Sequence, residues 1–198
     1  GQYSTLHRII LDEAGYPDTP IESWDDGSGD FGLTIEASRK LFSGIVVGDI
    51  LYKARSRWRP YAIDRDAFDR RMKDNFDDVV RTMESNGNLE KTLRNVAKDL
   101  SSLEYTNVRK PLVGIVGEIY VRVNVFTNGH LVETIEDAGG EAWTAPLTEW
   151  FQYLAYMDKA LARERNLGVG TRIKNRLKNS FMLRRDRVLT DCLIDVIG

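Results

Sequence analysis

The strongest constraint on the fold is a change in hydrophobic period near Pro111. From residue 33 to about residue 107, apolar residues recur every three or four positions, which is typical of amphipathic helices. Residues 112–117, Leu-Val-Gly-Ile-Val-Gly, form an uninterrupted apolar run, which is typical of a strand buried on both faces of a parallel sheet. The chain therefore has to combine a helical block with a sheet.

The order of elements after Pro111 predicts a βαβ unit. Residues 128–140 have a helical pattern that stops at two glycines, residues 141–146 are typical of a second strand, and residues 147–166 are again helical in pattern. A strand, a helix and a second strand in this order imply parallel pairing with a right-handed crossover. We predict an α/β fold, in which a flavodoxin-like or Rossmann-like half-domain adjoins the helical block.

Three regions follow from these patterns. Residues 1–32 are expected to be the C-terminal remnant of an upstream α/β domain, residues 33–107 the helical block, and residues 108–198 an α/β domain that is incomplete at its C-terminus. The chain starts at Gly1 without a Met and ends in an apolar run, whereas free termini are normally polar. We therefore expect a fragment of a larger multi-domain protein. Near its end, residues 171–187 predict one basic helix and the apolar run after them another.

Three helices are predicted in the helical block, and their periodic apolar residues are core candidates. Thr34 is the predicted N-cap of the first helix. The core candidates are Ile35, Leu41, Phe42, Ile45, Val46, Ile50, Leu51, Phe68, Met72, Phe76, Val79, Val80, Met83, Leu89, Leu93, Val96, Leu100 and Leu103.

Composition places the chain among soluble proteins. Its hydrophobic content of 42% and charged content of 29% are ordinary for a globular domain. No run approaches the about 18 consecutive apolar residues that a membrane helix requires, so no membrane partner is expected. The single cysteine, Cys192, excludes an internal disulfide framework and indicates a reducing compartment. We expect cytoplasmic localisation.

Charge is distributed unevenly along the chain. Residues 1–36 carry eight acids and one base, whereas residues 163–187 carry nine bases and two acids. Such asymmetry can steer an anionic ligand or partner toward the basic part. It is also what a solvated helix face, or a face covered by other protein, looks like. The sequence pI of about 5.8 and the lack of a base-reading motif argue against a nucleic-acid partner.

The candidate site follows the first predicted strand. In open α/β sheets, ligands bind at the carboxyl ends of the strands, and Glu118, Tyr120, Arg122 and Asn124 follow the strand end at Gly117. They supply an acceptor, an aromatic hydroxyl, a guanidinium and an amide, which together could bind a ligand. Because these residues alternate with aliphatic ones, they also fit an extension of the strand with one solvent-exposed face. Both interpretations stay open.

Other candidate chemistry is weaker. Neither His7 nor His130 has a Cys, His or carboxylate at metal-ligand spacing, and Cys192 lies among aliphatic residues, which is typical of an inert buried thiol. The glycines at 114 and 117 do not form the dinucleotide-binding motif, and residues 27–32 lack the lysine of a phosphate loop. No catalytic or metal-binding residue is predicted.

Three segments carry a resemblance to a known family. They are GQYSTLHRIILDEAGYPD at 1–18, SGIVVGDILYKARSRWRPYAID at 43–64, and RKPLVGIVGEIYVRVNVFTNGHLVETIEDAGGEAWTAPLTEW at 109–150. These segments resemble 2-hydroxyacyl-CoA dehydratase-related proteins of anaerobic bacteria, and most closely the dehydratase-like portion of large CoA-substrate-specific enzyme activases. The resemblance covers most of residues 1–155 and fades after residue 163.

This resemblance implies a function for the parent protein. In such proteins, cysteines from several loops hold an iron–sulfur cluster, and an ATP-hydrolysing activase supplies the electron with which a 2-hydroxyacyl-CoA loses water. The cysteine motif of the family precedes the segment that matches Gln2 and Tyr3, so the cluster ligands are missing here. Cys192 alone cannot replace them, because a cluster needs about four ligands. We expect no cofactor in this chain and no activity of the chain alone.

The resemblance also extends the candidate site. It implies that Gln2 and Tyr3 lie beside the cluster loop, and that Glu118 and Tyr120 lie on the facing half of the same cleft. The expected partners are other domains of the same polypeptide and an acyl-CoA ligand. The alternative is a non-catalytic interaction or scaffold module that docks a partner through its basic C-terminal helix.

Overall fold

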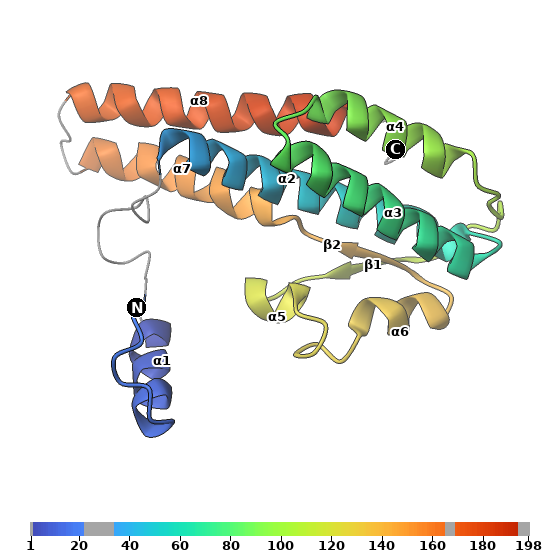
Figure 1. Cartoon of the computed structure of the whole chain (residues 1–198), viewed down its shortest axis with the longest axis horizontal. Coiled ribbons are helices and arrows are strands. Elements are labelled where there is room, and N and C mark those ends of the chain that lie inside the picture. The colour runs from blue at the N-terminus through green and yellow to red at the C-terminus, as the bar shows by residue number, and fades with distance from the viewer. Residues whose placement is uncertain (1, 22–33, 165–168, 194–198) are drawn as a thin grey trace. The chain divides into compact units, whose positions relative to one another are not determined.

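The computed structural model describes residues 2–21, 34–164 and 169–193 (Figure 1). The chain divides into two compact units, Gly1–Leu41 and Phe42–Gly198. This division differs from the boundaries at 32 and 107 that the sequence pattern suggests, and it places the helical block and the α/β segment in one unit. The suggested glycine-rich loop at 27–32, and most of a possible strand at 19–25, lie outside the described residues.

The first unit contains helix α1 (Gln2–Glu13) and the start of helix α2 (Ile35–Trp58). After α1 the chain turns at Gly15, whose φ of +85° favours glycine. The guanidinium of Arg8 then donates to the carbonyl oxygens of Pro17 and Thr19, both at 2.6 Å, and holds the turn against the helix. The predicted cap of α2 is confirmed, because the Thr34 hydroxyl accepts a hydrogen bond from the Ala37 amide at 3.1 Å.

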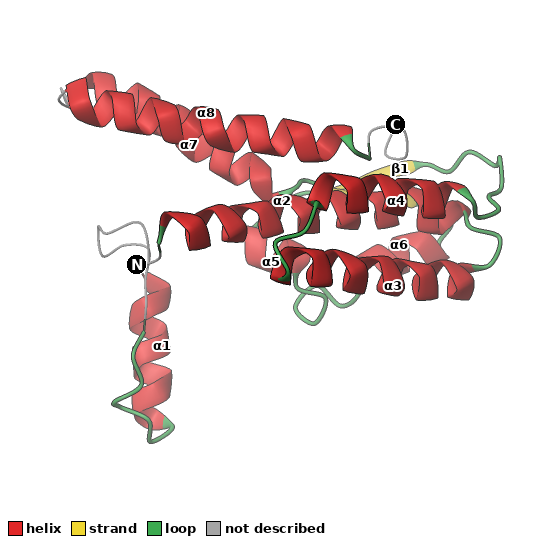
Figure 2. Ribbon diagram, turned by 45° about the horizontal axis from the view of Figure 1, so that its top comes forward, coloured by secondary structure: helices red, strands yellow, loops and turns green. Residues whose placement is uncertain are grey.

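The second unit is mostly helical (Figure 2). Its helices after α2 are the 3-10 turn η2 (Arg59–Tyr61), α3 (Arg65–Glu84), α4 (Leu89–Ser101), α5 (Ile119–Val123), α6 (Leu131–Asp137), α7 (Leu147–Glu164) and α8 (Val169–Asp191). Asp64 caps α3 by accepting from the Ala67 amide at 2.8 Å, and Asn88 caps α4 by accepting from the Lys91 amide at 3.0 Å.

The main core lies between α2, α3, α4 and the C-terminal end of α8. Its buried members are Val46, Val47, Ile50, Leu51, Ala54, Phe68, Val79, Leu89, Leu93, Val96, Leu100, Leu189, Cys192 and Leu193. The prediction was wrong for Phe76 and Val80, which are exposed, because α3 turns the face of Phe68, Asn75 and Val79 to the core and these two neighbours point away. Leu41 is also exposed.

The sheet has two strands, β1 (Leu112–Ile115) and β2 (Glu141–Thr144). They pair in parallel with Leu112 opposite Glu141 and Ile115 opposite Thr144, and α5 and α6 form the connection between them. The predicted parallel strand–helix–strand order is therefore confirmed, and the chain is α/β in this broad sense. Ile115, Val132 and Ala142 form a second, small core beneath α6.

The prediction that the first strand is buried on both faces was wrong. Leu112 is 62% exposed, Val113 is 39% exposed, and Val116, just after the strand, is 86% exposed. Among the described residues β1 pairs only with β2, so one of its edges carries no neighbouring strand. An apolar run predicts strand conformation, but burial depends on neighbours that the sequence of the run does not specify.

A buried glutamate joins α6 to the helices. The Glu136 side chain is fully buried, and its two carboxylate oxygens accept from Arg55 at 3.5 Å and from Arg59. Arg59 also forms a two-pronged pair with Asp69 of α3, at 2.7 and 2.9 Å. Asp69, and then Glu136, raise the pKa of Arg59 above its usual value. These charge pairs satisfy a carboxylate that would otherwise be costly to bury.

A second buried glutamate joins β2 to the end of α2. The carboxylate of Glu141 accepts from Arg57 at 2.8 Å and from the Tyr61 hydroxyl at 2.6 Å. Burial, and then the bond to Glu141, raise the pKa of Tyr61. The α/β segment is thus held to the helical block by ion pairs at α6 and at β2.

Helices α7 and α8 pack side by side in opposite directions (Figures 1 and 2). α8 is one continuous helix from Val169 to Asp191, so the predicted division into two helices near residue 187 was wrong. The last five residues of the second predicted helix, 194–198, lie outside the described residues. The apolar residues that suggested a second helix, Leu189 and Leu193, are instead the end of α8 and the turn after it, buried in the main core.

Candidate functional site

The two strands end at the same edge of the sheet. Because Ile115 lies opposite Thr144 in a parallel pair, the loop after β1 and the loop after β2 leave from the same edge. This carboxyl edge is where α/β proteins usually bind ligands. The loop after β1, residues 116–128, contains four of the predicted site residues and is here called the edge loop.

Glu118 turns the chain from strand to helix. It follows Gly117, whose φ of +130° favours glycine, and its carboxylate accepts from the Val121 amide at 2.9 Å as the N-cap of α5. The alternative interpretation, a strand extension with one solvent-exposed face, was wrong because residues 119–123 are helical. The carboxylate of Glu118 is therefore engaged with the backbone of its own loop.

Tyr120 and Asn124 form a linked pair on the exposed side of α5. The Asn124 amide group donates to the Tyr120 hydroxyl at 3.1 Å. The amide oxygen of Asn124 accepts from the backbone and the hydroxyl of Thr127, at 2.9 and 2.8 Å, and so shapes the turn after the helix. The Tyr120 ring is 60% exposed, and its hydroxyl keeps a proton to donate.

Arg122 is half-buried. Its Nε atom is buried and has no hydrogen-bond partner among the described residues, while the Asn128 side chain donates to its carbonyl oxygen at 3.1 Å. A buried donor without a partner costs about 1–3 kcal/mol. An acceptor supplied from outside this unit would remove that cost.

Gln2 and Tyr3 lie in the other unit. Both belong to α1, and Tyr3 is exposed. Their expected position opposite the edge loop relates two separate units and stays a prediction.

Sequence reasoning missed three residues of α2 that lie near the C-terminal end of β2. The carboxylate of Asp49 accepts from the backbone amides of Leu147 and Thr148, at 2.9 and 2.7 Å, and so caps α7 from a distant helix. The Lys53 ammonium lies 4.4 Å from the centre of the Trp143 ring. Burial raises the pKa of Tyr52, which packs against the small core. A signal was present for Asp49, because it is an acid inside an otherwise apolar helical run.

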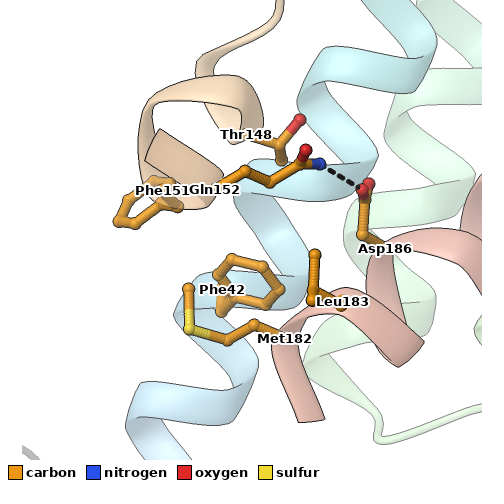
Figure 3. A pocket seen from close by; sticks show the side chains of 7 residues that line it. All are labelled: Phe42, Thr148, Phe151, Gln152, Met182, Leu183 and Asp186. Carbon is orange, nitrogen blue, oxygen red and sulfur yellow. Dashed lines mark hydrogen bonds between the residues drawn. The ribbon is translucent and has the colours of Figure 1, made fainter. Parts of the chain in front are cut away.

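Two hollows lie elsewhere in the second unit. The first, between α2, α7 and α8, measures about 10 Å³ and holds no more than a water molecule (Figure 3). Its walls include Phe42 and Phe151, whose rings pack edge to face at 5.8 Å, and Asp186, which accepts from Gln152 at 3.1 Å. Burial raises the pKa of Asp186. This hollow is a packing feature and not a ligand site.

The second hollow is a polar groove of about 300 Å³ between α3 and α4. Several of its lining side chains bond within the groove walls: the Thr82 and Thr92 hydroxyls lie 3.0 Å apart, and Arg81 pairs with Asp78. These groups are therefore already satisfied by local partners.

The donor set of this chain does not fit an iron–sulfur cluster. Among the described residues, no group of three or more His, Cys, Asp or Glu is arranged to hold a metal. Cys192 is buried, its thiol donates to the Val188 carbonyl oxygen at 3.3 Å, and burial raises its pKa. No helix in the described part of the chain combines the length and apolar character needed to cross a membrane.

Comparison with models of known families, with curated proteins and with solved structures gives no significant match for this chain.

Proposed function

We propose that this chain supplies one wall of an acyl-CoA cleft in a 2-hydroxyacyl-CoA dehydratase-like or activase-like protein, and that it has no activity alone. The observation that carries the proposal is the set of polar groups on the edge loop: the Tyr120 hydroxyl, the Asn124 amide and the Arg122 Nε, which has no partner in the described part of the chain. The flavodoxin-like or Rossmann-like sheet and the cytoplasmic location are part of this proposal.

The chemistry of CoA matches these groups. Its nucleotide end carries phosphates, for which a guanidinium is a strong partner, and its pantetheine arm carries amide carbonyls that accept hydrogen bonds. In this proposal Arg122 binds a phosphate. The Tyr120 hydroxyl, which accepts from Asn124, donates its own proton to a pantetheine carbonyl. Glu118 holds the first turn of α5 and does not contact the ligand.

The exposed strand supports the further proposal that other domains of the same polypeptide cover this region. Strands of α/β sheets are normally covered, whereas Leu112 and Val116 face solvent. The iron–sulfur cluster and ATP hydrolysis that the resemblance implies are assigned to those other domains, because the residues that the structure describes include no group arranged to hold a metal.

Nuclear magnetic resonance of the 198-residue chain tests the proposal. Titration with butyryl-CoA should shift backbone amide signals of the edge loop and of Ala145, Leu147 and Thr148, which lie at the same edge. The Arg122→Ala variant should lose these shifts. Arg94→Ala, which removes an exposed guanidinium from α4, is the matched control and should keep them.

Two results would overturn the proposal. One is the absence of any shift at millimolar butyryl-CoA. The other is a set of shifts confined to the polar groove between α3 and α4, which would place the ligand elsewhere.

A further inference from the structure

Helix α8 is buried near its C-terminal end and carries exposed apolar residues earlier along its length. Near its C-terminal end, Leu189 is fully buried, and Arg185 donates to the Ser43 hydroxyl at 3.2 Å and pairs with Glu90 at 3.6 Å. Earlier in the helix, Ile173 is 54% and Leu177 is 67% exposed. The helix is thus held by the core while its first turns present apolar side chains to solvent.

Three of the exposed apolar residues of α8 form a narrow stripe, and a fourth, Leu183, which is 49% exposed, lies off it. Ile173, Leu177 and Phe181 are spaced by four, so they lie along one side of the helix. Helices that pack on a globular core normally carry a broader apolar face, whereas a stripe this narrow has the width of a coiled-coil seam. The stripe is therefore suited to one further helix.

The same helix carries unmatched positive charge. Its sequence contains seven bases and two acids. Arg176, Arg184 and Arg187 are exposed, and within the described part of the chain none of the three has an acidic partner. A partner for this surface has to bring negative charge as well as aliphatic side chains.

We propose that the exposed side of α8 docks an acidic amphipathic helix of a partner protein, which packs as a third helix beside α7 and α8. The partner's aliphatic residues would cover Ile173 and Leu177, and its carboxylates would pair with the exposed arginines. Complementary charge of this kind sets specificity and speeds association. This inference develops the docking alternative and does not depend on the acyl-CoA proposal.

Two other anionic partners fit less well. A nucleic acid would use the arginines but leave the aliphatic stripe exposed, and the chain as a whole is acidic, with a net charge of −2. A membrane surface calls for a broad apolar face with bulky residues, whereas most other positions in the first turns of α8 are polar or basic.

A synthetic peptide provides the test. The probe is a fluorescent helical peptide with leucines at seam positions and glutamates beside them. Its affinity for the full chain, measured by fluorescence anisotropy, should exceed that of a lysine version of the peptide by at least about tenfold, and it should weaken as salt is added. Binding of single-stranded DNA and of phosphatidylserine vesicles is measured in parallel, to test the two other anionic partners.

Matched variants separate the two parts of the surface. Ile173→Ser combined with Leu177→Ser should weaken peptide binding by about tenfold or more, as expected for apolar contacts at the centre of an interface. Phe126→Ser, which removes an exposed ring from the edge loop, should not. Arg184→Ser with Arg187→Ser should reduce the salt dependence, and Arg94→Ser should leave it unchanged. Because all these residues are exposed, helix content by circular dichroism should be retained.

The proposal is overturned if the acidic peptide does not bind, if the serine variant binds it as tightly as the wild type, or if DNA or vesicles bind more tightly than the peptide.

Discussion

Glu118 offers a residue-scale test that separates capping from ligand contact. Ser and Ala are both small and uncharged, but only Ser can accept the Val121 amide as an N-cap. We expect Glu118→Ala to weaken α5 locally by about 1 kcal/mol and to speed hydrogen exchange at the Val121 amide, while Glu118→Ser changes either by little. If Ser lowers butyryl-CoA binding as much as Ala while exchange stays slow, the carboxylate itself contacts the ligand, contrary to our assignment.

Glu136 is the second residue-scale test. Glu136→Gln keeps the size of the side chain but leaves Arg55 and Arg59 without their buried counter-charge. Removing one member of a buried ion pair costs about 3–5 kcal/mol, so we expect a loss of that order in the free energy of unfolding, measured with denaturant. Asp137→Asn is the matched control. It breaks the exposed pair with Arg65 and should cost less than about 1 kcal/mol. Equal losses would show that burial of Glu136 is not what matters.

Residue roles that depend on neighbours close in the sequence could be predicted, whereas roles that depend on residues far apart in the sequence could not. The cap at Thr34 was predicted because donor and acceptor are three residues apart. Glu136 and its partner Arg55 are 81 residues apart, and the local sequence around either residue does not predict that they pair. For the edge loop, the sequence placed the residues at a strand end correctly but did not show that Glu118 is used as a cap.

At the scale of elements, the cap of α7 is supplied by another helix. The carboxylate of Asp49 satisfies the amides of Leu147 and Thr148, which would otherwise lack partners at the start of α7. We expect Asp49→Ala to destabilise the docking of α7 by about 1–2 kcal/mol, seen as faster hydrogen exchange at these two amides. Asp74→Ala, an exposed aspartate of α3, is the matched control. Unchanged exchange in the Asp49 variant would mean that α7 is held by its side chains alone.

The existence of the elements followed from sequence more reliably than their surroundings. Strands β1 and β2, helix α6 between them and α7 were all predicted, because period and glycine stops are local signals. The burial of β1 was not, since it requires a neighbour on each side. The continuity of α8 was missed because its amphipathic pattern changes where the helix enters the core near Leu189.

At the scale of the whole molecule, the second unit has two different exposed surfaces to which we assign partners. One is the apolar edge of β1, which we propose is covered by other domains of the same polypeptide. The other is the exposed side of α8, which we propose binds a partner protein. They differ in chemistry, because the edge offers backbone groups and aliphatic side chains, whereas the α8 surface combines aliphatic side chains with arginines. Loss of one interaction should therefore leave the other intact, and the two proposals can fail separately.

Stability of the molecule at high pH depends on Tyr105. Its hydroxyl donates to the Leu100 carbonyl oxygen at 2.6 Å. Burial, and to a lesser degree the nearby Asp99 carboxylate, raise the pKa of Tyr105 from 10.0 to about 12. Because the folded state keeps a proton that the unfolded state releases, this contribution to stability is complete below about pH 10 and is lost as the pH rises toward about 12. Burial raises the pKa of Tyr52, Tyr61 and Cys192 as well, which acts in the same direction.

We therefore expect the free energy of unfolding to fall steeply over this alkaline interval, measured by denaturant titration at each pH. Tyr105→Phe keeps the ring but removes the ionisable hydroxyl. It should be less stable than the wild type at neutral pH, because the bond to Leu100 is lost, and its stability should fall less between about pH 10 and 12. Tyr153→Phe changes an exposed ring and should leave the wild-type curve unaltered. A Tyr105→Phe curve parallel to that of the wild type would mean that the alkaline loss has another source, and the remaining buried tyrosines would be tested in the same way.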